Sequence, residues 1–159
     1  MRYIYIVFLV AGLMSSFTAI AQENQQSQQD VFQSIYNASK EKIQSQQYQY
    51  IGEYVYQNKT REILEGNSNT LSINGSNANG KITALKKANK TFVVDGTIKD
   101  YDVDYNDSKR TIRVKFKVES PAEGYDVLID VKPNGNAFLT LKNSAMETIS
   151  WTGKLAALD

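Results

Sequence analysis

The sequence predicts a mainly β fold, in which an antiparallel meander of about eight strands closes into a barrel beside one N-terminal helix. Residues 92–155 contain successive runs of alternating apolar and polar residues, and turn-forming residues separate these runs. The apolar residues of each run fall on one face, and a long sheet with one apolar face must be covered or must curl on itself. One helix covers too little of such a sheet, so closure into a barrel is expected.

The first 21 residues have the pattern of a secretory signal peptide. Arg2 precedes an apolar run of 11 residues, from Ile4 to Met14, which is too short to cross a bilayer. Ala19 and Ala21 are small residues at the two positions that a signal peptidase reads, so cleavage is expected after Ala21. The chain has no Cys to carry a lipid anchor. We therefore expect a secreted or periplasmic protein that is not a lipoprotein and has no transmembrane segment after cleavage.

Composition excludes several classes of function. Removing 21 residues from the 159 leaves 138, which suits one domain, with 17 basic and 17 acidic residues. This balance does not favour binding to nucleic acid. The sequence has no Cys and no His, so disulfides, thiol catalysis, His-based triads and typical zinc sites are excluded. We expect no cofactor, no metal and no enzymatic activity, although carboxylate-only, Ser/Lys or Tyr mechanisms stay formally open.

The mature chain is expected to contain a flexible leader and one domain. Residues 22–29 include five Gln and no apolar residue, as is typical of a flexible leader. Residues 30–159 form the predicted domain, in which Asp30 can cap a helix that runs to about Ser45. Apolar residues recur at helical spacing along this helix, which should cover one end or face of the sheet. They are Val31, Phe32, Ile35, Tyr36 and Ile43.

The first predicted strand, residues 47–57, carries half of the eight tyrosines of the mature chain. These four residues are predicted to share one face and are the candidate ligand-binding residues: Tyr48, Tyr50, Tyr54 and Tyr56. Such a row can bind sugars or another flat ligand by stacking. Alternatively, the rings line the barrel or pack under the helix, which is the commoner role of aromatic residues in strands.

The segment between residues 66 and 90 gives weaker signals. Residues 66–80 are rich in Asn, Gly and Ser, and Leu71 and Ile73 alternate within them, which indicates a short strand between turns. Residues 81–85 are a further strand candidate, and residues 86–90 are expected to form an exposed loop.

Residues 98–105 and 111–118 are predicted to form a hairpin around the loop 106–109. The register that pairs Tyr105 with Arg110 places apolar residues opposite apolar residues and acids opposite bases. The cross-strand pairs of this register are Val103–Ile112, Tyr101–Val114, Asp102–Arg113 and Asp100–Lys115.

Three aspartates alternate along the first strand of this hairpin, at positions 100, 102 and 104. Oxygen clusters bind hard cations, but a compact calcium loop needs a tight turn containing Gly, which is absent here. Cross-strand pairing with Arg113 and Lys115 is therefore the preferred interpretation. Ile98 falls out of phase with Tyr101, so a β-bulge is expected near Lys99 or Asp100.

Residues 125–132 and 136–142 are predicted to form a second hairpin around Pro133-Asn134-Gly135. A two-residue loop and a three-residue loop give competing registers, and the three-residue loop aligns the apolar faces and suits Pro and Gly at their turn positions. Its pairs are Val131–Ala137, Ile129–Leu139 and Val127–Leu141. A final strand, residues 146–155, should place Ile149 and Trp151 opposite Leu139 and Ala137.

Several motifs in residues 92–155 resemble those of a known family. They are a Phe-x-Gly-like turn (here Val94-Asp95-Gly96), a D-Y-x-V strand (100–103), a V-x-P-N-G-x-A-x-L hairpin (131–139) and a closing I-S-W-x-G (149–153). With the signal peptide and helix, the chain is similar to the secreted family labelled domain of unknown function 4251, found mainly in the Bacteroidetes. The resemblance implies a lipocalin-like barrel topology and no activity. The family's Leu-Pro-Tyr-Phe-Gly-like loop is not matched, because residues 85–89 keep only Leu85.

The sequence favours a non-catalytic secreted or periplasmic protein that binds a small apolar or amphipathic ligand inside a lipocalin-like barrel. The alternative is an envelope-associated protein-interaction module with a filled core, which binds a partner through an edge strand or loop. An interior void of roughly several hundred cubic ångströms would favour the first hypothesis, and a close-packed interior the second. The partner is thus either an unknown small ligand or an envelope protein.

The position of cleavage can be tested directly. Export from a bacterial host should yield a mature chain that begins at Gln22, because Ala21 is the last small residue of the cleavage motif. N-terminal sequencing and the intact mass of the exported protein check this. Recovery of the uncleaved chain in the membrane fraction would contradict it.

Overall fold

The structure, a computed structural model, describes residues 28–57, 59–65, 68–85, 90–121, 123–142 and 148–158. A helix spans residues 28–45. The strands of the described part are β1 (Gln47–Gln57), β2 (Thr60–Ile63), β3 (Thr70–Asn74), β4 (Asn77–Thr83), β5 (Thr91–Asn106), β6 (Thr111–Glu119), β7 (Tyr125–Val131), β8 (Asn136–Lys142) and β9 (Ile149–Ala157).

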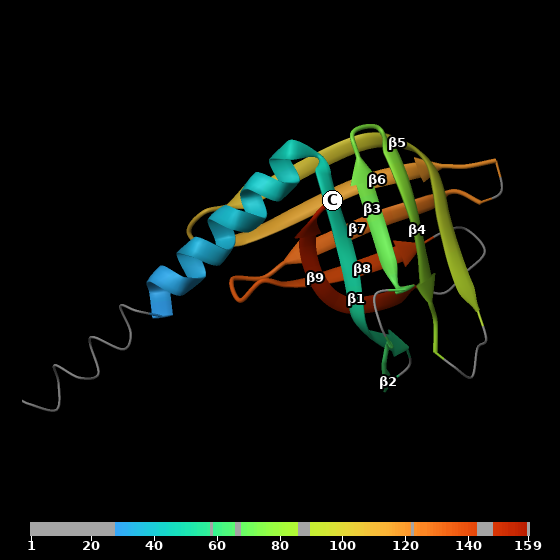
Figure 1. The fold of residues 1–159 in the computed structure, drawn as a ribbon, viewed down its shortest axis with the longest axis horizontal. Helices are drawn as coiled ribbons and strands as arrows, with labels where there is room; N and C mark the ends of the chain where they lie inside the picture. Colours follow the sequence, from blue (N-terminus) through green and yellow to red (C-terminus); the bar gives the residue numbers. More distant parts are fainter. Residues whose placement is uncertain are drawn as a thin grey trace, which may run out of the picture.

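The strands form one antiparallel meander that closes on itself (Figure 1). From β3 to β9 each strand pairs with the next, while β1 pairs with β3 on one side and with β9 on the other. The short β2, which was not predicted, pairs with the C-terminal half of β1. The remaining eight strands make a closed barrel, so the predicted mainly β, lipocalin-like barrel with one N-terminal helix is confirmed.

The hairpin β7–β8 has the predicted three-residue register. Val131 pairs with Ala137 and Ile129 with Leu139. Gly135 has a φ of 83° and donates its backbone N–H to the Lys132 carbonyl oxygen at 2.9 Å. The left-handed conformation at this position suits a type I turn followed by Gly, which is why the pattern Pro-Asn-Gly predicted the loop correctly.

The predicted register of the β5–β6 hairpin is wrong by two residues. Tyr105 pairs with Ile112, not with Arg110. The reason lies in the turn, where the Asn106 side-chain Oδ1 accepts hydrogen bonds at 2.9 Å from the Lys109 backbone N–H and from the Ser108 hydroxyl. Asn106 therefore ends the strand, and the turn occupies residues 107–110. The facing of the side chains is kept, because a shift of two residues preserves the period of a strand.

The closing strand shows the same kind of displacement. Trp151 pairs with Leu139 and Ile149 with Leu141, so the predicted pairing of β8 with β9 is also wrong by two residues. Part of the predicted strand, residues 146–147, lies outside the described residues, as does most of the loop predicted at 86–90.

Two β-bulges interrupt the regular pairing. The bulge predicted in β5 is confirmed, since the register shifts between Lys99 and Asp102 and Asp100 has a positive φ of 52°. The second bulge, between Gly52 and Tyr54 in β1, was not predicted. A bulge adds one residue to one strand and so reverses which side chains face the interior beyond it.

The core is the apolar interior of the barrel. The apolar face predicted for residues 92–155 lies in this core: thirteen of its residues between 112 and 151 are buried, while Tyr101 and Val103 are partly buried and pack against the core. The buried members are Ile112, Val114, Phe116, Val118, Tyr125, Val127, Ile129, Val131, Ala137, Leu139, Leu141, Ile149 and Trp151. The first half of the domain adds Tyr48, Tyr50, Val55, Leu71, Ile73, Ala78, Ile82, Ala84, Leu85, Phe92, Val94 and Ile98.

The helix lies across one end of the barrel, over the turns of the β5–β6 and β7–β8 hairpins (Figure 1). Tyr36 and Ile43 of the predicted apolar stripe are buried, whereas Val31 is 54% exposed. Three hydrogen bonds between described residues attach the helix to the β5–β6 turn, and one of them runs from Lys40 Nζ to Asp107 Oδ1 at 3.1 Å. The Tyr36 hydroxyl donates to Asp107 Oδ1 at 2.6 Å, and Arg110 donates to Gln33 at 2.9 Å.

Residues 28 and 29, which were predicted to belong to the leader, are helical in the structure. Asp30 lies within the helix and does not cap it. The predicted signal peptide and residues 22–27 lie outside the described residues. Among the described residues, no helix is both long enough and apolar enough to cross a membrane.

The attachment of the helix is predicted to depend on pH through Asp107. Hydrogen bonds from Tyr36 and then from Lys40 lower the pKa of this carboxyl below 3.8, so its contribution to stability is complete above about pH 4 and is lost as the pH falls further. Asp107→Ala should lower the melting temperature at pH 7 and reduce the fall in melting temperature on acidification. Circular dichroism at several pH values measures both effects.

Lys109→Ala is the matched control, because it changes an exposed side chain of the same turn and leaves the backbone hydrogen bond to Asn106 in place. Equal acid sensitivity of Asp107→Ala and the wild type would show that Asp107 does not hold the helix.

Candidate functional site

The predicted row of four tyrosines is divided by the bulge in β1. Tyr48 and Tyr50 are fully buried inside the barrel, whereas Tyr54 lies half-buried on the outer face and Tyr56 is 38% exposed there. The prediction that all four share one face is therefore wrong, because strict alternation does not continue through a bulge. Two separate environments result, and each is a candidate for binding.

Inside the barrel, Tyr48 is hydrogen-bonded and Tyr50 is not. The Tyr48 and Tyr101 hydroxyl oxygens lie 3.2 Å apart. The Tyr50 hydroxyl is buried, and no described group meets it with hydrogen-bonding geometry. Burial is the main cause that raises the pKa of both Tyr48 and Tyr50. The nearby Leu139 backbone acts in the opposite direction on the pKa of Tyr50, although it does not meet the Tyr50 hydroxyl with the geometry of a hydrogen bond.

Large side chains occupy the rest of the interior. The rings of Phe92 and Trp151 meet edge to face with centroids 5.8 Å apart, and those of Tyr101 and Phe116 are stacked at 5.7 Å. The Trp151 indole N–H donates to the Thr83 carbonyl oxygen at 2.9 Å, so this ring is fixed in place. The described interior is thus filled by interlocking side chains, as is usual for an eight-stranded barrel of this size.

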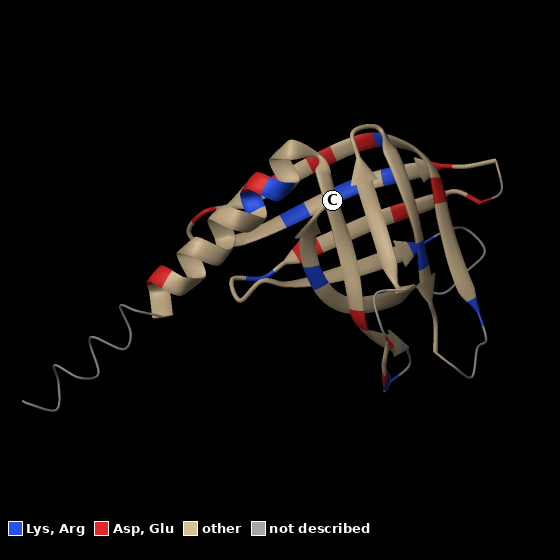
Figure 2. Ribbon diagram, in the orientation of Figure 1, with Lys and Arg blue, Asp and Glu red and all other residues tan. Residues whose placement is uncertain are grey.

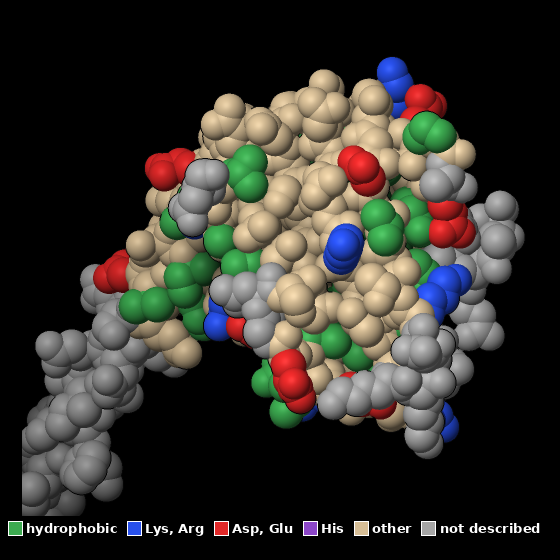
Figure 3. Space-filling model, turned by 45° about the vertical axis from the view of Figure 1, so that its right-hand side comes forward, with side chains coloured by type: hydrophobic (Ala, Val, Ile, Leu, Met, Phe, Trp, Pro, Cys, Tyr) green, Lys and Arg blue, Asp and Glu red, His purple; other side chains and the backbone are tan. Residues whose placement is uncertain are grey.

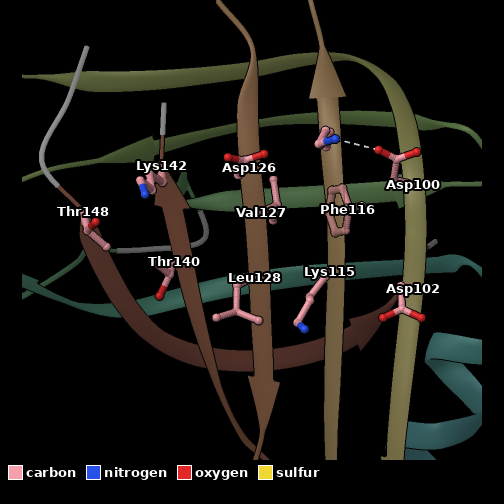
Figure 4. A pocket seen from close by; sticks show the side chains of 11 residues that line it. Asp100, Asp102, Lys115, Phe116, Asp126, Val127, Leu128, Thr140, Lys142 and Thr148 are labelled. Atoms are coloured by element: carbon pink, nitrogen blue, oxygen red, sulfur yellow. Dashed lines mark hydrogen bonds and ion pairs between the residues drawn. The ribbon is translucent and has the colours of Figure 1, made fainter. Parts of the chain in front are cut away.

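A hollow of ligand size lies instead on the outer face of β5–β8, which we call the outer trough. Its volume is about 450 Å³, within the usual range of ligand pockets. It runs across the strands between two rows of side chains, and Leu128 stands in the middle of one row, between Lys115 and Thr140 (Figure 4). One row is Asp102, Lys115, Leu128 and Thr140, and the other is Asp100, Lys117, Asp126, Lys142 and Thr148.

Charges alternate in sign from strand to strand around this trough, with acids on β5 and β7 and bases on β6 and β8 (Figure 2). Lys117 Nζ lies 2.7 Å from Asp100 Oδ2, and the hydrogen bond from Lys117 lowers the pKa of the Asp100 carboxyl. Arg113 pairs with Asp130 of β7 at 2.7 Å. The predicted Asp102–Arg113 and Asp100–Lys115 pairs are thus wrong, because the register and the β5 bulge bring other partners together.

Asp102, Asp104 and the other acids do not gather into a cation site. In the ranges that the structure describes, no group of three or more acidic side chains is arranged to hold a metal ion. Figure 3 shows a face of the molecule on which acidic and basic side chains are interspersed rather than separated by sign. The alternation of charge around the trough itself suits a ligand that is neutral overall.

The other half of the tyrosine row belongs to a second outer surface, on β1, β9 and β8. Tyr54 and Phe138 flank Thr152 along one row. The guanidinium carbon of Arg61 lies 3.8 Å from the centroid of the Tyr54 ring. Lys132 Nζ lies 5.7 Å from the centroid of the Phe138 ring.

Sequence analysis did not find the trough or the role of Leu128. The available signal is the segment Val127-Leu128-Ile129, in which an apolar residue occupies the outward position between two aspartates of the same face. Such an interruption of the alternation is readable, but its significance depends on which residues of β6 and β8 lie beside it.

Comparisons with known proteins show relatives without an assigned activity. A family model described as "Domain of unknown function (DUF4251)" matches residues 31–155. A crystal structure of a DUF4251 family protein from Bacteroides eggerthii DSM 20697 is similar, with a TM-score of 0.69, 18% sequence identity, and coverage of 81% of this chain and 91% of that chain. At this identity the likeness shows the fold alone. A search of curated proteins finds no match.

The two interior tyrosines should respond differently to loss of their hydroxyls. Tyr50→Phe removes a buried hydroxyl without a partner and should be neutral or raise the free energy of unfolding by up to about 1 kcal/mol. Tyr48→Phe breaks the hydrogen bond to Tyr101 and should lower it by about 0.5–1.5 kcal/mol. Urea unfolding measures both values. A loss for Tyr50→Phe as large as that for Tyr48→Phe would show that the Tyr50 hydroxyl has a partner in solution.

Proposed function

The chain belongs to the family described as Domain of unknown function (DUF4251), and we propose that it is a non-catalytic binding protein of the periplasm or cell exterior. Its ligand is a zwitterionic amphiphile, a molecule with an apolar body and a head group that carries both charges. The ligand lies in the outer trough, and the barrel is the scaffold that holds this surface. The observation that carries the proposal is a ligand-sized apolar hollow outside a barrel whose described interior is filled.

The chemistry of the side chains supports binding rather than catalysis. The sequence has no His and no Cys, which are the usual general base and the usual thiol nucleophile. The shifted pKa values of acids and bases belong to exposed ion pairs such as Asp100–Lys117, and those of tyrosines are raised mainly by burial. These are structural causes that do not position an acid and a base around one reacting atom.

The shape of the trough supports an amphiphile. Leu128 is half-buried on the outer face, where β-strands of a barrel normally expose polar residues. Its neighbours on β6 and β8 are Lys115 and Thr140. The stems of Lys115 and Lys142, which line the same trough, add apolar surface below their ammonium groups. An apolar chain of modest length can therefore cover Leu128 and the neighbouring backbone.

The rim supports a head group with both charges. It contains three aspartates and three lysines, at positions 100, 102 and 126 and at positions 115, 117 and 142. Because acids and bases alternate between neighbouring strands, a singly charged head group would lie as close to a like charge as to an opposite one. A zwitterion can instead place each charge beside its complement.

Binding inside the barrel is the competing hypothesis, and the buried Tyr50 hydroxyl without a partner favours it. The size of the site distinguishes the two hypotheses. An unpartnered hydroxyl among filled side chains suits one water molecule, whereas the trough suits a molecule of ligand size.

The test uses monomeric dihexanoylphosphatidylcholine as the probe, titrated into the full mature protein and followed by ¹H–¹⁵N NMR. Residues of β6–β8 around Leu128 should shift, and Leu128→Ser should weaken binding roughly tenfold because it removes the apolar floor. Dihexanoylphosphatidic acid, which has the same chains and an anionic head group, should bind more weakly.

Ile63→Ser is the matched control, since Ile63 is a 69% exposed apolar residue of β2, away from the trough. It should leave the affinity unchanged. The trough is not the site if neither lipid binds. It is also not the site if Tyr48→Phe and Tyr50→Phe weaken binding of the phosphatidylcholine and Leu128→Ser does not.

A further inference from the structure

We propose that the outer surface of β1, β9 and β8 is a second binding site, which takes a carbohydrate chain that carries carboxylate groups. This surface, the aromatic platform, consists of Tyr54, Tyr56, Phe138, Ser150, Thr152 and Thr140. The proposal goes beyond the trough, because it concerns the outer face of β1 and β9, which meets the trough at Thr140 of β8, and another class of ligand.

The aromatic residues of the platform are arranged for stacking. Tyr54, Thr152 and Phe138 are neighbours along one row, so the two rings are separated by one intervening strand, or about 10 Å. Tyr56 lies in the adjacent row and is 38% exposed, and Phe138 is 37% exposed. Phe138 and Tyr56 are the rings on which sugars of a chain can stack, because the Arg61 guanidinium covers the ring of Tyr54.

Hydroxyl groups fill the space between the rings. Thr140 Oγ1 and Ser150 Oγ lie 3.1 Å apart, and both face the same outer surface. Thr152 is buried beneath this surface, and its hydroxyl has no hydrogen-bond partner among the described groups. The partly exposed hydroxyls of Thr140 and Ser150 are therefore the ones that a sugar can reach.

Cations at both ends of the platform select an acidic chain. The Arg61 guanidinium carbon lies 3.8 Å from the centroid of the Tyr54 ring and 5.9 Å from that of Tyr56, and Lys132 stands over Phe138. In the described part of the chain, these two cations contact rings rather than carboxylates. Arginine offers a planar pair of donors that matches a carboxylate while it remains stacked. Two cations at the ends therefore fit a chain with repeated carboxylates.

The simplest alternative is that Tyr54 and Phe138 only shield the backbone of β9. In that case the rings contribute to stability but bind nothing. A test must therefore separate binding from folding.

The probe is oligogalacturonate, and its fully methyl-esterified form is the matched neutral chain. Isothermal titration and ¹H–¹⁵N NMR should show binding of the acidic chain, with shifts at residues 54–56, 138 and 150–152. Phe138→Ala should weaken binding about tenfold because it removes a stacking face. Arg61→Gln should weaken binding of the acidic chain and make that binding depend less on salt concentration. The neutral ester should bind the wild type more weakly than the acidic chain does.

Val93→Ala is the control, because Val93 is a 54% exposed apolar residue of β5 outside the platform. Leu128→Ser is the second control and should leave oligogalacturonate binding unchanged, which separates this site from the trough. Melting temperatures confirm that each variant is folded. No binding of the acidic chain, equal binding of the ester, or binding that survives Phe138→Ala in a folded variant would overturn the proposal.

Discussion

The pairing of β9 with β1 is the contact on which the rest of the structure depends. It joins the two ends of the meander along eight residue pairs, from Tyr48–Ala157 to Tyr56–Ser150. Closure removes the free edges of the sheet and encloses the apolar side chains in one interior. At its centre Gly52 faces Gly153, and a Cβ on Gly153 would collide with the Ile51 carbonyl oxygen. The strands can therefore approach only with glycine at this position, which gives a physical reason for the Gly in the closing I-S-W-x-G motif.

Closure also makes the bulges decisive. In a closed barrel every side chain of a strand faces either the filled interior or the outer surface. One extra residue in a strand therefore reverses the facing of the side chains that follow it. The bulge after Gly52 divides four tyrosines of similar sequence context into two buried residues and two outer ones. The bulge at Asp100 brings that carboxylate to Lys117 and so forms one end of the outer trough.

These constraints place the candidate binding surfaces outside the barrel. The interior carries Trp151, Phe92, Tyr48 and Tyr50 in contact with aliphatic side chains, which gives a rigid scaffold. Strands that are fixed on their inner side hold the outer side chains at set spacings. The trough and the aromatic platform lie on adjoining strands of this scaffold and meet at Thr140, so two different chemistries occupy one continuous outer surface.

The sequence by itself determined the mainly β architecture, the helix, the inward residues from Ile112 to Trp151 and the register of the Pro-Asn-Gly hairpin, because period-two alternation and local turn chemistry are encoded within a few residues. It did not determine the β5–β6 register, where a side-chain hydrogen bond at Asn106 sets the pairing, or the β8–β9 register. Nor did it determine the sites. Only the tertiary structure showed that Tyr54 and Phe138 lie on either side of β9, and that Leu128 lies between Lys115 and Thr140. The reason is that strands distant in sequence become neighbours only when the barrel closes.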